Sequence, residues 1–293
     1  MANLKEIRTR ISTVISTRQI TGAMKMVSAA KLRRVQDAII MMKPYCDELM
    51  EIFDRIGGYV LQTNNPFTEK RPVNSVLIIL VTSNRGLCGS FNLNSAKRAI
   101  ELINKEFSKQ HKSGNTEIIC IGKKGADYLR LKGYNIKSVN QELLEKPSPD
   151  KTFSFIEPIM RKFENREFDR VVVVCNKFKN AAVQRLVSET FLPINIDPPE
   201  DVENNNDNEY ILEPSKDYLV QSLIPLVLKT KFYSALLNSS ASEHGARMTA
   251  MHKASDNADK LTRELKLNYN KARQSHITNE LIEIVSGADA LNK

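Results

Sequence analysis

The chemistry most worth testing in this sequence is phosphate binding at residues 83–90, S-N-R-G-L-C-G-S, which contain Gly86 and Gly89. The loop follows an apolar run and precedes a helical pattern, the position at which doubly wound α/β folds bind phosphate. It lacks both the full G-x-G-x-x-G pattern and the Lys-Ser/Thr pair of a P-loop. A tight turn is therefore the favoured interpretation here, and also for residues 122–125, G-K-K-G.

Cysteine and histidine side chains are the other candidates for chemistry, and their spacing indicates none. The four cysteines form no C-x-x-C pair, and His244 and His252 lie two helical turns apart without a third ligand nearby in sequence. No Ser/His/Asp or Cys/His set is placed by a motif. We therefore expect reduced thiols and no metal, cofactor or catalytic residue in this chain. The cysteines are Cys46, Cys88, Cys120 and Cys175.

Positive charge is concentrated at the start of the chain. The sequence has 293 residues and a formal net charge of +9, and residues 1–34 hold eight basic side chains against one acidic side chain. A basic helix is most often a solvated face, and the alternatives are a nucleic-acid surface and an acidic protein surface. The aromatic content is 6% with no Trp, which is unfavourable for stacking on single strands. The basic residues are Lys5, Arg8, Arg10, Arg18, Lys25, Lys31, Arg33 and Arg34.

The end of the chain has the pattern of one long helix. Starting near Ser215, it would contain about 75 residues and extend roughly 110 Å at the usual rise of an α-helix. A helix of that length needs a partner helix, a surrounding sleeve, or both. Its small and apolar positions are Met248, Met251, Ala254, Ala258, Leu261, Leu265 and Ala272.

The start of the chain, residues 2–57, supplies the partner helix. One heptad seam is predicted over Val35–Ile56, and a second, in a shifted phase, over Leu4–Val14. The difference in phase predicts a slip between about Thr21 and Ser28. The pair Gly57-Gly58 is expected to end the helix. The first seam consists of Val35, Ala38, Met42, Tyr45, Leu49, Ile52 and Ile56, and the second of Leu4, Ile7, Ile11 and Val14.

The middle of the chain has a different pattern, in which apolar strands alternate with helices. Strands are predicted at 75–82, 116–121, 169–176 and 182–189, with helices at 92–109, 126–131 and 153–165. Continuous apolar strands that alternate with helices predict a mostly parallel sheet covered on both faces. The predicted fold is therefore a long antiparallel two-helix coiled coil with an inserted Rossmann-like α/β domain. The predicted divisions are a helix at 1–57, the α/β domain at 73–195, an acidic surface loop at 196–214 and a helix at 215–289.

Four segments of the sequence resemble one known family. They are T-G-A-M-K-M-V-S-A-A-K-L-R-R at 21–34, S-N-R-G-L-C-G-S-F-N at 83–92, R-M-T-A-M-H-K-A-S-D-N-A at 247–258 and Y-N-K-A-R-Q-S-H-I-T-N-E-L-I-E-I-V-S-G-A at 269–288. Their order, spacing and the total length resemble the gamma subunits of bacterial F-type ATP synthases. The resemblance implies a rotor shaft of the F1 sector that couples ion-driven rotation of the c-ring to ATP synthesis or hydrolysis on the alpha/beta ring. It also implies a subunit that is not itself an enzyme.

The resemblance also implies partners and contact residues. The partners are three alpha and three beta subunits, the epsilon subunit and the c-ring, with no nucleic acid. Residues 196–212 correspond to part of the foot beside the c-ring and epsilon. Met24 and Lys25 match positions that face acidic loops of the beta subunits. The positions that match the meeting of shaft and ring are Arg247, Gln274, Thr278 and Glu280.

Two further groups follow from charge and periodicity. The basic collar, Lys5, Arg8 and Arg10, is expected to face the acidic ring. The apolar bearing, Ile277, Leu281, Ile284 and Val285, points to several sides of a helix, and a helix apolar on several sides must be buried on several sides. We expect an apolar sleeve from the upper ends of the alpha/beta ring around these residues.

The chain is expected to lie at the cytoplasmic face of the bacterial plasma membrane as a peripheral subunit. Met1 leads into a charged helix, which predicts no signal peptide, and no apolar run approaches the ~20 residues of a membrane span. Two other functions remain possible on the sequence alone. A basic coiled-coil nucleic-acid binder predicts affinity that falls steeply with salt, and a nucleotide-binding enzyme predicts saturable nucleotide binding by the α/β domain.

Overall fold

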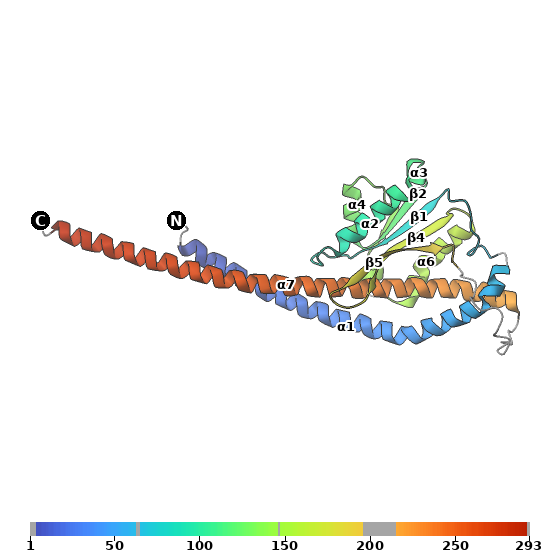
Figure 1. The fold of residues 1–293 in the computed structure, drawn as a ribbon, viewed down its shortest axis with the longest axis horizontal. Coiled ribbons are helices and arrows are strands. Elements are labelled where there is room, and N and C mark those ends of the chain that lie inside the picture. The colour runs from blue at the N-terminus through green and yellow to red at the C-terminus, as the bar shows by residue number, and fades with distance from the viewer. Residues whose placement is uncertain (1–3, 63–64, 146, 196–214, 292–293) are drawn as a thin grey trace. The chain divides into compact units, whose positions relative to one another are not determined.

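The chain forms two compact units in a computed structural model that describes residues 4–62, 65–145, 147–195 and 215–291 (Figure 1). Unit 1 lies within residues 1–29 and 248–293, and unit 2 is formed by residues 30–247. Helices α1 (Leu4–Gln62) and α7 (Lys216–Leu291) each contribute to both units. The predicted acidic loop at 196–214 lies outside the described residues.

Unit 1 is an antiparallel pair of helices, the start of α1 and the end of α7. Thr21 bonds to Ser255, and Arg18, one turn earlier in α1, bonds to Asp259, one turn later in α7. One set of buried or half-buried positions of α7 repeats in steps of three and four, as a coiled coil requires, and Ala254 and Asp259 are half-buried beside it. The set consists of Met251, Ser255, Ala258, Thr262, Leu265, Tyr269 and Ala272. Leu261, which was predicted in this seam, is exposed.

The predicted slip in α1 is wrong, because one heptad phase runs along the helix. In unit 1 it passes through the exposed Arg18 and the half-buried Lys25, neither of which was predicted as a seam position. In unit 2 the same phase continues, so Cys46 and Phe53 replace the predicted Tyr45 and Ile52, which are exposed. The phase consists of Leu4, Ile7, Ile11, Val14, Arg18, Thr21, Lys25, Ser28, Leu32, Val35, Ile39, Met42, Cys46, Leu49 and Phe53.

The core of unit 2 is a five-stranded sheet in the order β3-β2-β1-β4-β5. Strands β1 (Val76–Val81), β2 (Thr116–Ile121), β3 (Ser138–Asn140) and β4 (Arg170–Phe178) pair in parallel, and β5 (Gln184–Leu192) pairs antiparallel with β4. The register aligns Val76 of β1 with Thr116 and with Arg170. The predicted mostly parallel sheet is confirmed.

Helices cover both faces of the sheet, and the central strand β1 divides its side chains between them. Val76, Ile78 and Leu80 join a core with α2 (Phe91–Lys105) and α4 (Lys123–Leu131). The alternate residues, Leu77, Ile79 and Val81, join a second core with α6 (Pro149–Glu164) and with the parts of α1 and α7 in unit 2 (Figure 1). Every residue of β1 is buried, which explains its continuous apolar sequence.

The remaining differences from prediction are local. α1 continues five residues past Gly57 to Gln62, because a helical glycine costs only about 1 kcal/mol relative to alanine and does not by itself end a helix. The predicted helix at 92–109 is two helices, α2 and α3 (Ser108–Lys112). Strand β3 and the four-residue helix α5 (Glu142–Glu145) were not predicted.

Candidate functional site

The seam of unit 1 is narrow because many of its side chains are small and polar. Thr21 and Ser255 share a hydrogen bond of 2.7 Å across the seam, and Arg18 Nη1 lies 2.8 Å from Asp259 Oδ1. Thr262 is buried, and its hydroxyl donates to the Ala258 carbonyl at 2.7 Å. Each buried hydroxyl named here has a partner, so small polar residues can occupy the seam without an unpaired polar group.

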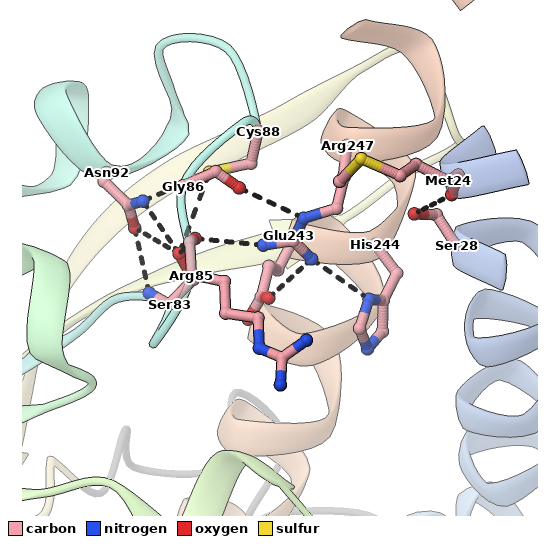
Figure 2. Close-up of polar contacts among 10 residues, drawn as sticks. All are labelled: Met24, Ser28, Ser83, Arg85, Gly86, Cys88, Asn92, Glu243, His244 and Arg247. Carbon is pink, nitrogen blue, oxygen red and sulfur yellow. Dashed lines mark hydrogen bonds and ion pairs between the residues drawn. The ribbon is translucent and has the colours of Figure 1, made fainter. Parts of the chain in front are cut away.

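Met24 and Lys25 are both half-buried, Lys25 on the seam and Met24 next to it. Ser28 donates its hydroxyl to the Met24 carbonyl at 2.8 Å, which fixes one turn of α1 (Figure 2). Exposed apolar side chains surround this turn, and the sequence analysis missed them. In the sequence they could have been recognised as apolar residues at positions outside the heptad seam. They are Ile20, Met26 and Val27, each more than half exposed.

The basic collar is a set of exposed cations on the first two turns of α1. Lys5, Arg8 and Arg10 are all exposed. Exposed ion pairs contribute only about 0–1 kcal/mol to folding stability, so a contribution to folding does not account for these cations.

The end of α7 from residue 273 to residue 288 is exposed along its whole length. Thr278 donates to the Gln274 carbonyl at 2.9 Å, and His276 Nδ1 lies 3.2 Å from Glu280 Oε1. The apolar bearing is on the same stretch. Its side chains Ile277, Leu281, Ile284 and Val285 are 46%, 57%, 68% and 59% exposed. Apolar side chains this exposed in a contiguous stretch mark an interaction surface.

Arg247 lies in unit 2, where its hydrogen bonds are made within the chain. Its Nη1 lies 2.7 Å from Glu243 Oε1, its Nε donates to the Gly86 carbonyl at 3.2 Å, and its Nη2 donates to the Arg85 carbonyl at 3.0 Å (Figure 2). Arg247 and Glu243 are each only 8% exposed. Arg247 therefore ties α7 to the loop that follows β1, and its predicted contact with the alpha/beta ring stays a prediction.

Burial sets the protonation of the groups around Arg247. Burial lowers the pKa of His244 to about 4, and the nearby Arg247 and Lys31 lower it further in the same direction. Burial raises the pKa of Glu243 above its usual value, while Arg247 opposes that rise. His244 is consequently neutral at pH 7, and its Nδ1 lies 3.4 Å from Arg247 Nη1.

The loop at 83–90 is held by its own side chains. Asn92 accepts the Ser83 backbone N–H at 2.9 Å through Oδ1 and donates to the Ser83 hydroxyl at 2.7 Å through Nδ2. Leu87 and Gly89 have φ of 63° and 59°, which makes this a tight turn. At the second glycine pair, Gly122 has φ 99°, and a Cβ there would lie 2.1 Å from the Thr82 carbonyl oxygen. These features give the glycines a structural role, as the sequence favoured.

A polar cavity of about 520 Å³ adjoins the Arg247 network. Its walls come from the loop after β1, α5, α6, α7 and the part of α1 in unit 2. The charged residues among them have both signs, so the cavity suits a partner that carries both donors and acceptors. They are Lys31, Arg85, Glu142, Glu145, Lys151, Glu243 and Arg247.

Within the described residues, no three His, Cys, Asp or Glu side chains are grouped to hold a metal ion. The same residues include no helix that is long and apolar enough to cross a membrane. The four cysteines are not in disulfides, and Cys88, Cys120 and Cys175 are buried. Burial raises the pKa of Cys120 and of Cys175 to about 12, so these thiols are protonated at neutral pH.

Comparison with known proteins decides the family. A family model described as ATP synthase matches residues 3–291. The ATP synthase gamma chain of Christiangramia forsetii is 46% identical over 293 residues, covering all of both chains. The chain belongs to the ATP synthase gamma-chain family. A gamma chain from Cytophaga hutchinsonii is 45% identical over 294 residues, again over all of both chains.

Solved structures of ATP synthases contain chains with the same fold. A chain of the Euglena gracilis mitochondrial ATP synthase described as OSCP/F1/c-ring has a TM-score of 0.67 and 21% identity, over 98% of this chain and 94% of that one. A chain from a structure described as the rotor of the same enzyme has a TM-score of 0.64 and 20% identity, over 94% and 98%. At these identities the likeness bears on the fold, and it confirms the predicted class of terminal helices with an α/β insert.

The predicted resemblance to the gamma-chain family is therefore confirmed over the full length. As a member of the family, the chain is a component of an ATP synthase. The structure groups Gln274, Thr278 and Glu280 on the exposed end of α7, places Met24 and Lys25 on α1 in unit 1, and places Arg247 in unit 2. Their individual roles stay predictions.

Proposed function

We infer that this gamma chain is the central rotor shaft of an F1 sector. Its proposed partners are three alpha and three beta subunits, the epsilon subunit and the c-ring, with no nucleic acid. Rotation of the c-ring, driven by ion transport, would turn the shaft and so couple transport to ATP synthesis or hydrolysis on the alpha/beta ring. The observation that carries this proposal is the exposed apolar end of α7, residues 273–288, at the end of a narrow two-helix seam.

The physical requirement is a stiff and asymmetric rod. A two-helix coiled coil supplies stiffness, and the small residues of its seam keep the helices close enough for a central cavity. A shaft that presents different faces to three equivalent sites favours a different conformation in each, which is population shift by differential contact. The proposed ring contacts are Met24, Lys25, Arg247, Gln274, Thr278 and Glu280.

The basic collar and the apolar bearing are proposed to guide rotation in different ways. Lys5, Arg8 and Arg10 act through charge over several ångströms, so they can pass from one acidic loop to the next without a specific pocket. The four residues of the bearing make apolar contact, which has no preferred direction and creates no angular traps. Residues 196–212 are proposed to form part of the foot beside epsilon and the c-ring.

The chain itself is proposed to be non-catalytic and without a cofactor, and to lie peripherally at the cytoplasmic face of the bacterial plasma membrane. The hydrogen bonds of the 83–90 loop support the first point, because its polar side chains are used to close a turn. The proposed division into shaft helices at 1–57 and 215–289 and an α/β domain at 73–195 separates torque transmission from attachment at the base.

The test is ATP hydrolysis by the purified chain, by an alpha/beta ring, and by the two together. We expect no turnover by the chain alone and stimulated turnover in the reconstituted complex. Arg85→Ala changes a cation of the loop and Lys124→Ala changes one beside it, since the Lys124 side chain lies next to Gly86, and the two serve as matched variants. Turnover by the chain alone that disappears in these variants would favour a nucleotide-using enzyme and contradict the proposal.

A further inference from the structure

We propose that unit 2 contains a binding site for a small uncharged aromatic molecule with one hydrogen-bonding group. The site is a cavity of about 250 Å³ between α1, the β4–β5 pair and α7. Leu49 of α1, Val173 of β4 and Phe232 of α7 are among its walls. The proposed rotor contacts do not use this cavity, so the proposal is independent of them.

The walls favour an aromatic occupant. Phe191 and Phe232 line the cavity with their rings edge to face, at a centroid distance of 5.6 Å. Three sulfur-containing side chains, Cys46, Met50 and Cys175, also line it. Sulfur makes favourable contacts with the edges of aromatic rings, and aromatic rings pack well against one another at this spacing. An apolar site with a few polar groups is typical of small-molecule binding.

One wall residue, Thr230, has a hydroxyl left without a partner. Thr230 is only 3% exposed, and its Oγ1 has no hydrogen-bond partner among the described residues. A threonine within a helix usually satisfies its hydroxyl on a carbonyl one turn earlier, as Thr262 does in the same helix. Buried polar atoms are nearly always paired, so this hydroxyl calls for a partner supplied from within the cavity. A ligand hydroxyl would supply it.

The charges at the cavity favour an uncharged ligand. Lys177 and Glu189 both line it, and they form an ion pair with each other, so neither sign is left in excess by that pair. Burial raises the pKa of Cys175 to about 12 and also raises the pKa of Cys46, so both thiols are neutral. The third charged wall residue, Lys231, is exposed, so solvent screens its charge. Met50 is exposed as well, and these two residues mark the side on which the cavity meets solvent.

The experiment titrates the full-length chain with 1-naphthol and with naphthalene, which differ by one hydroxyl. We expect saturable binding of both at one site, with 1-naphthol bound about five- to tenfold more tightly, the worth of one net hydrogen bond. Thr230→Val keeps the shape and removes the hydroxyl, so it should abolish that preference while naphthalene affinity stays within about twofold. Ala235→Leu adds volume at the wall and should abolish binding of both probes.

Two controls complete the design. Gln221→Ala changes an exposed residue of the same helix and should leave both affinities unchanged. In the ligand-free chain, Thr230→Val should raise the Tm, because it removes an unpaired buried hydroxyl. No saturable binding of either probe, binding that survives Ala235→Leu, or a lower Tm for Thr230→Val would each overturn the proposal. The last result would mean that the hydroxyl is already satisfied without a ligand.

Discussion

Thr21 of α1 and Ser255 of α7 share a hydrogen bond of 2.7 Å, and this pair sets the register of the coiled coil in unit 1. In an antiparallel pair with this register, Leu4 falls near Ala272. Ala272 is also the last half-buried residue of α7, and every described side chain after it is exposed. The register thus determines where the helix pair ends and where the exposed end of α7 begins.

The first prediction concerns the energy of that register bond. Thr21→Val should lower the free energy of unfolding by about 1 kcal/mol, because it removes the Thr21 hydroxyl that pairs with Ser255. Ser255→Ala should cost less, because the Thr21 hydroxyl still donates to the Arg18 carbonyl at 3.0 Å. The double variant should lose less than the two single losses combined, which is the signature of a direct interaction. Chemical denaturation followed by helical circular dichroism measures all three. Thr17→Val, at an exposed hydroxyl in the same helix, is the control and should stay within about 0.5 kcal/mol.

The second prediction concerns pH and His244. The pKa of His244 is about 4 in the folded chain and near 6.5 when unfolded, so the unfolded state binds more protons between these values. The free energy of unfolding should therefore fall as pH drops from about 6.5 to about 4, by at most about 1.4 kcal/mol per pH unit from this group. His244→Gln should flatten that slope, measured by denaturation at a series of pH values.

Neighbouring groups give this pH test its controls. The raised pKa of Glu243 acts in the opposite direction, because the folded chain then holds that proton more tightly above pH 4.5. Glu243→Gln should consequently steepen the fall. His252→Gln makes the same exchange at an exposed histidine of the same helix and serves as the matched control. An unchanged slope in His244→Gln would show that this histidine is not responsible.

The long helices and the buried strands could be predicted because their signals are continuous. The strand at 116–121 was predicted to the residue, and the predicted start of α7 at 215 differs from the observed start by one. β3 and α5 contain three and four residues, too few for any periodicity to appear. These short elements depend on the sheet and its loops for their stability, which local sequence does not encode.

The helix faces were harder to predict than the helices. Residues 45 and 46, and again 52 and 53, are all apolar or small, so the sequence allowed either phase; the structure buries Cys46 and Phe53. Cys46 lines the apolar cavity and Phe53 packs in the core beneath the sheet, contacts made by distant parts of the chain. Thr262 is buried in place of Leu261 because it falls on the seam phase of Ala258 and Leu265, and its hydroxyl is satisfied within the helix.

The Arg247 network could not be predicted from local sequence. Arg247 and Gly86 are 161 positions apart, and only the fold brings the guanidinium to the loop carbonyls. The exposed collar and the exposed end of α7 are different, because charge and apolar residues on several helix faces are visible in the sequence itself.

The third prediction concerns the basic collar. The triple variant Lys5→Glu, Arg8→Glu and Arg10→Glu should change the Tm of the chain little, since all three side chains are exposed. In the assembled complex it should weaken coupling, measured as ion pumping per ATP hydrolysed, because the introduced carboxylates would repel an acidic ring. Reversal of Lys109, Lys112 and Lys132, three exposed lysines of unit 2, is the matched control. Normal coupling by a collar variant that is itself destabilised would make the collar structural.

The last prediction concerns the apolar bearing. Truncation after Asn279 removes only side chains that are exposed wherever they are described, so the Tm of the isolated chain should be unchanged within error. If an apolar sleeve surrounds this end in the complex, the truncated complex should assemble in lower yield and turn over ATP more slowly, because buried apolar area is lost at about 25 cal/mol per Å². Rotation should persist, since the proposed contacts at Met24 and Lys25 remain.

A full-length variant separates loss of apolar contact from loss of length. Serine at Ile277, Leu281, Ile284 and Val285 should reproduce the truncated complex, whereas serine at the exposed Asn279 and Glu283 of the same helix should not. The measurements are assembly yield, dissociation temperature of the complex and ATPase rate. Full stability of the four-serine complex would remove the sleeve from the proposal. Complete loss of directional rotation would instead mean that this end of α7 transmits torque. If its contact were only guiding, the proposed contacts at Met24 and Lys25 would still impose a direction.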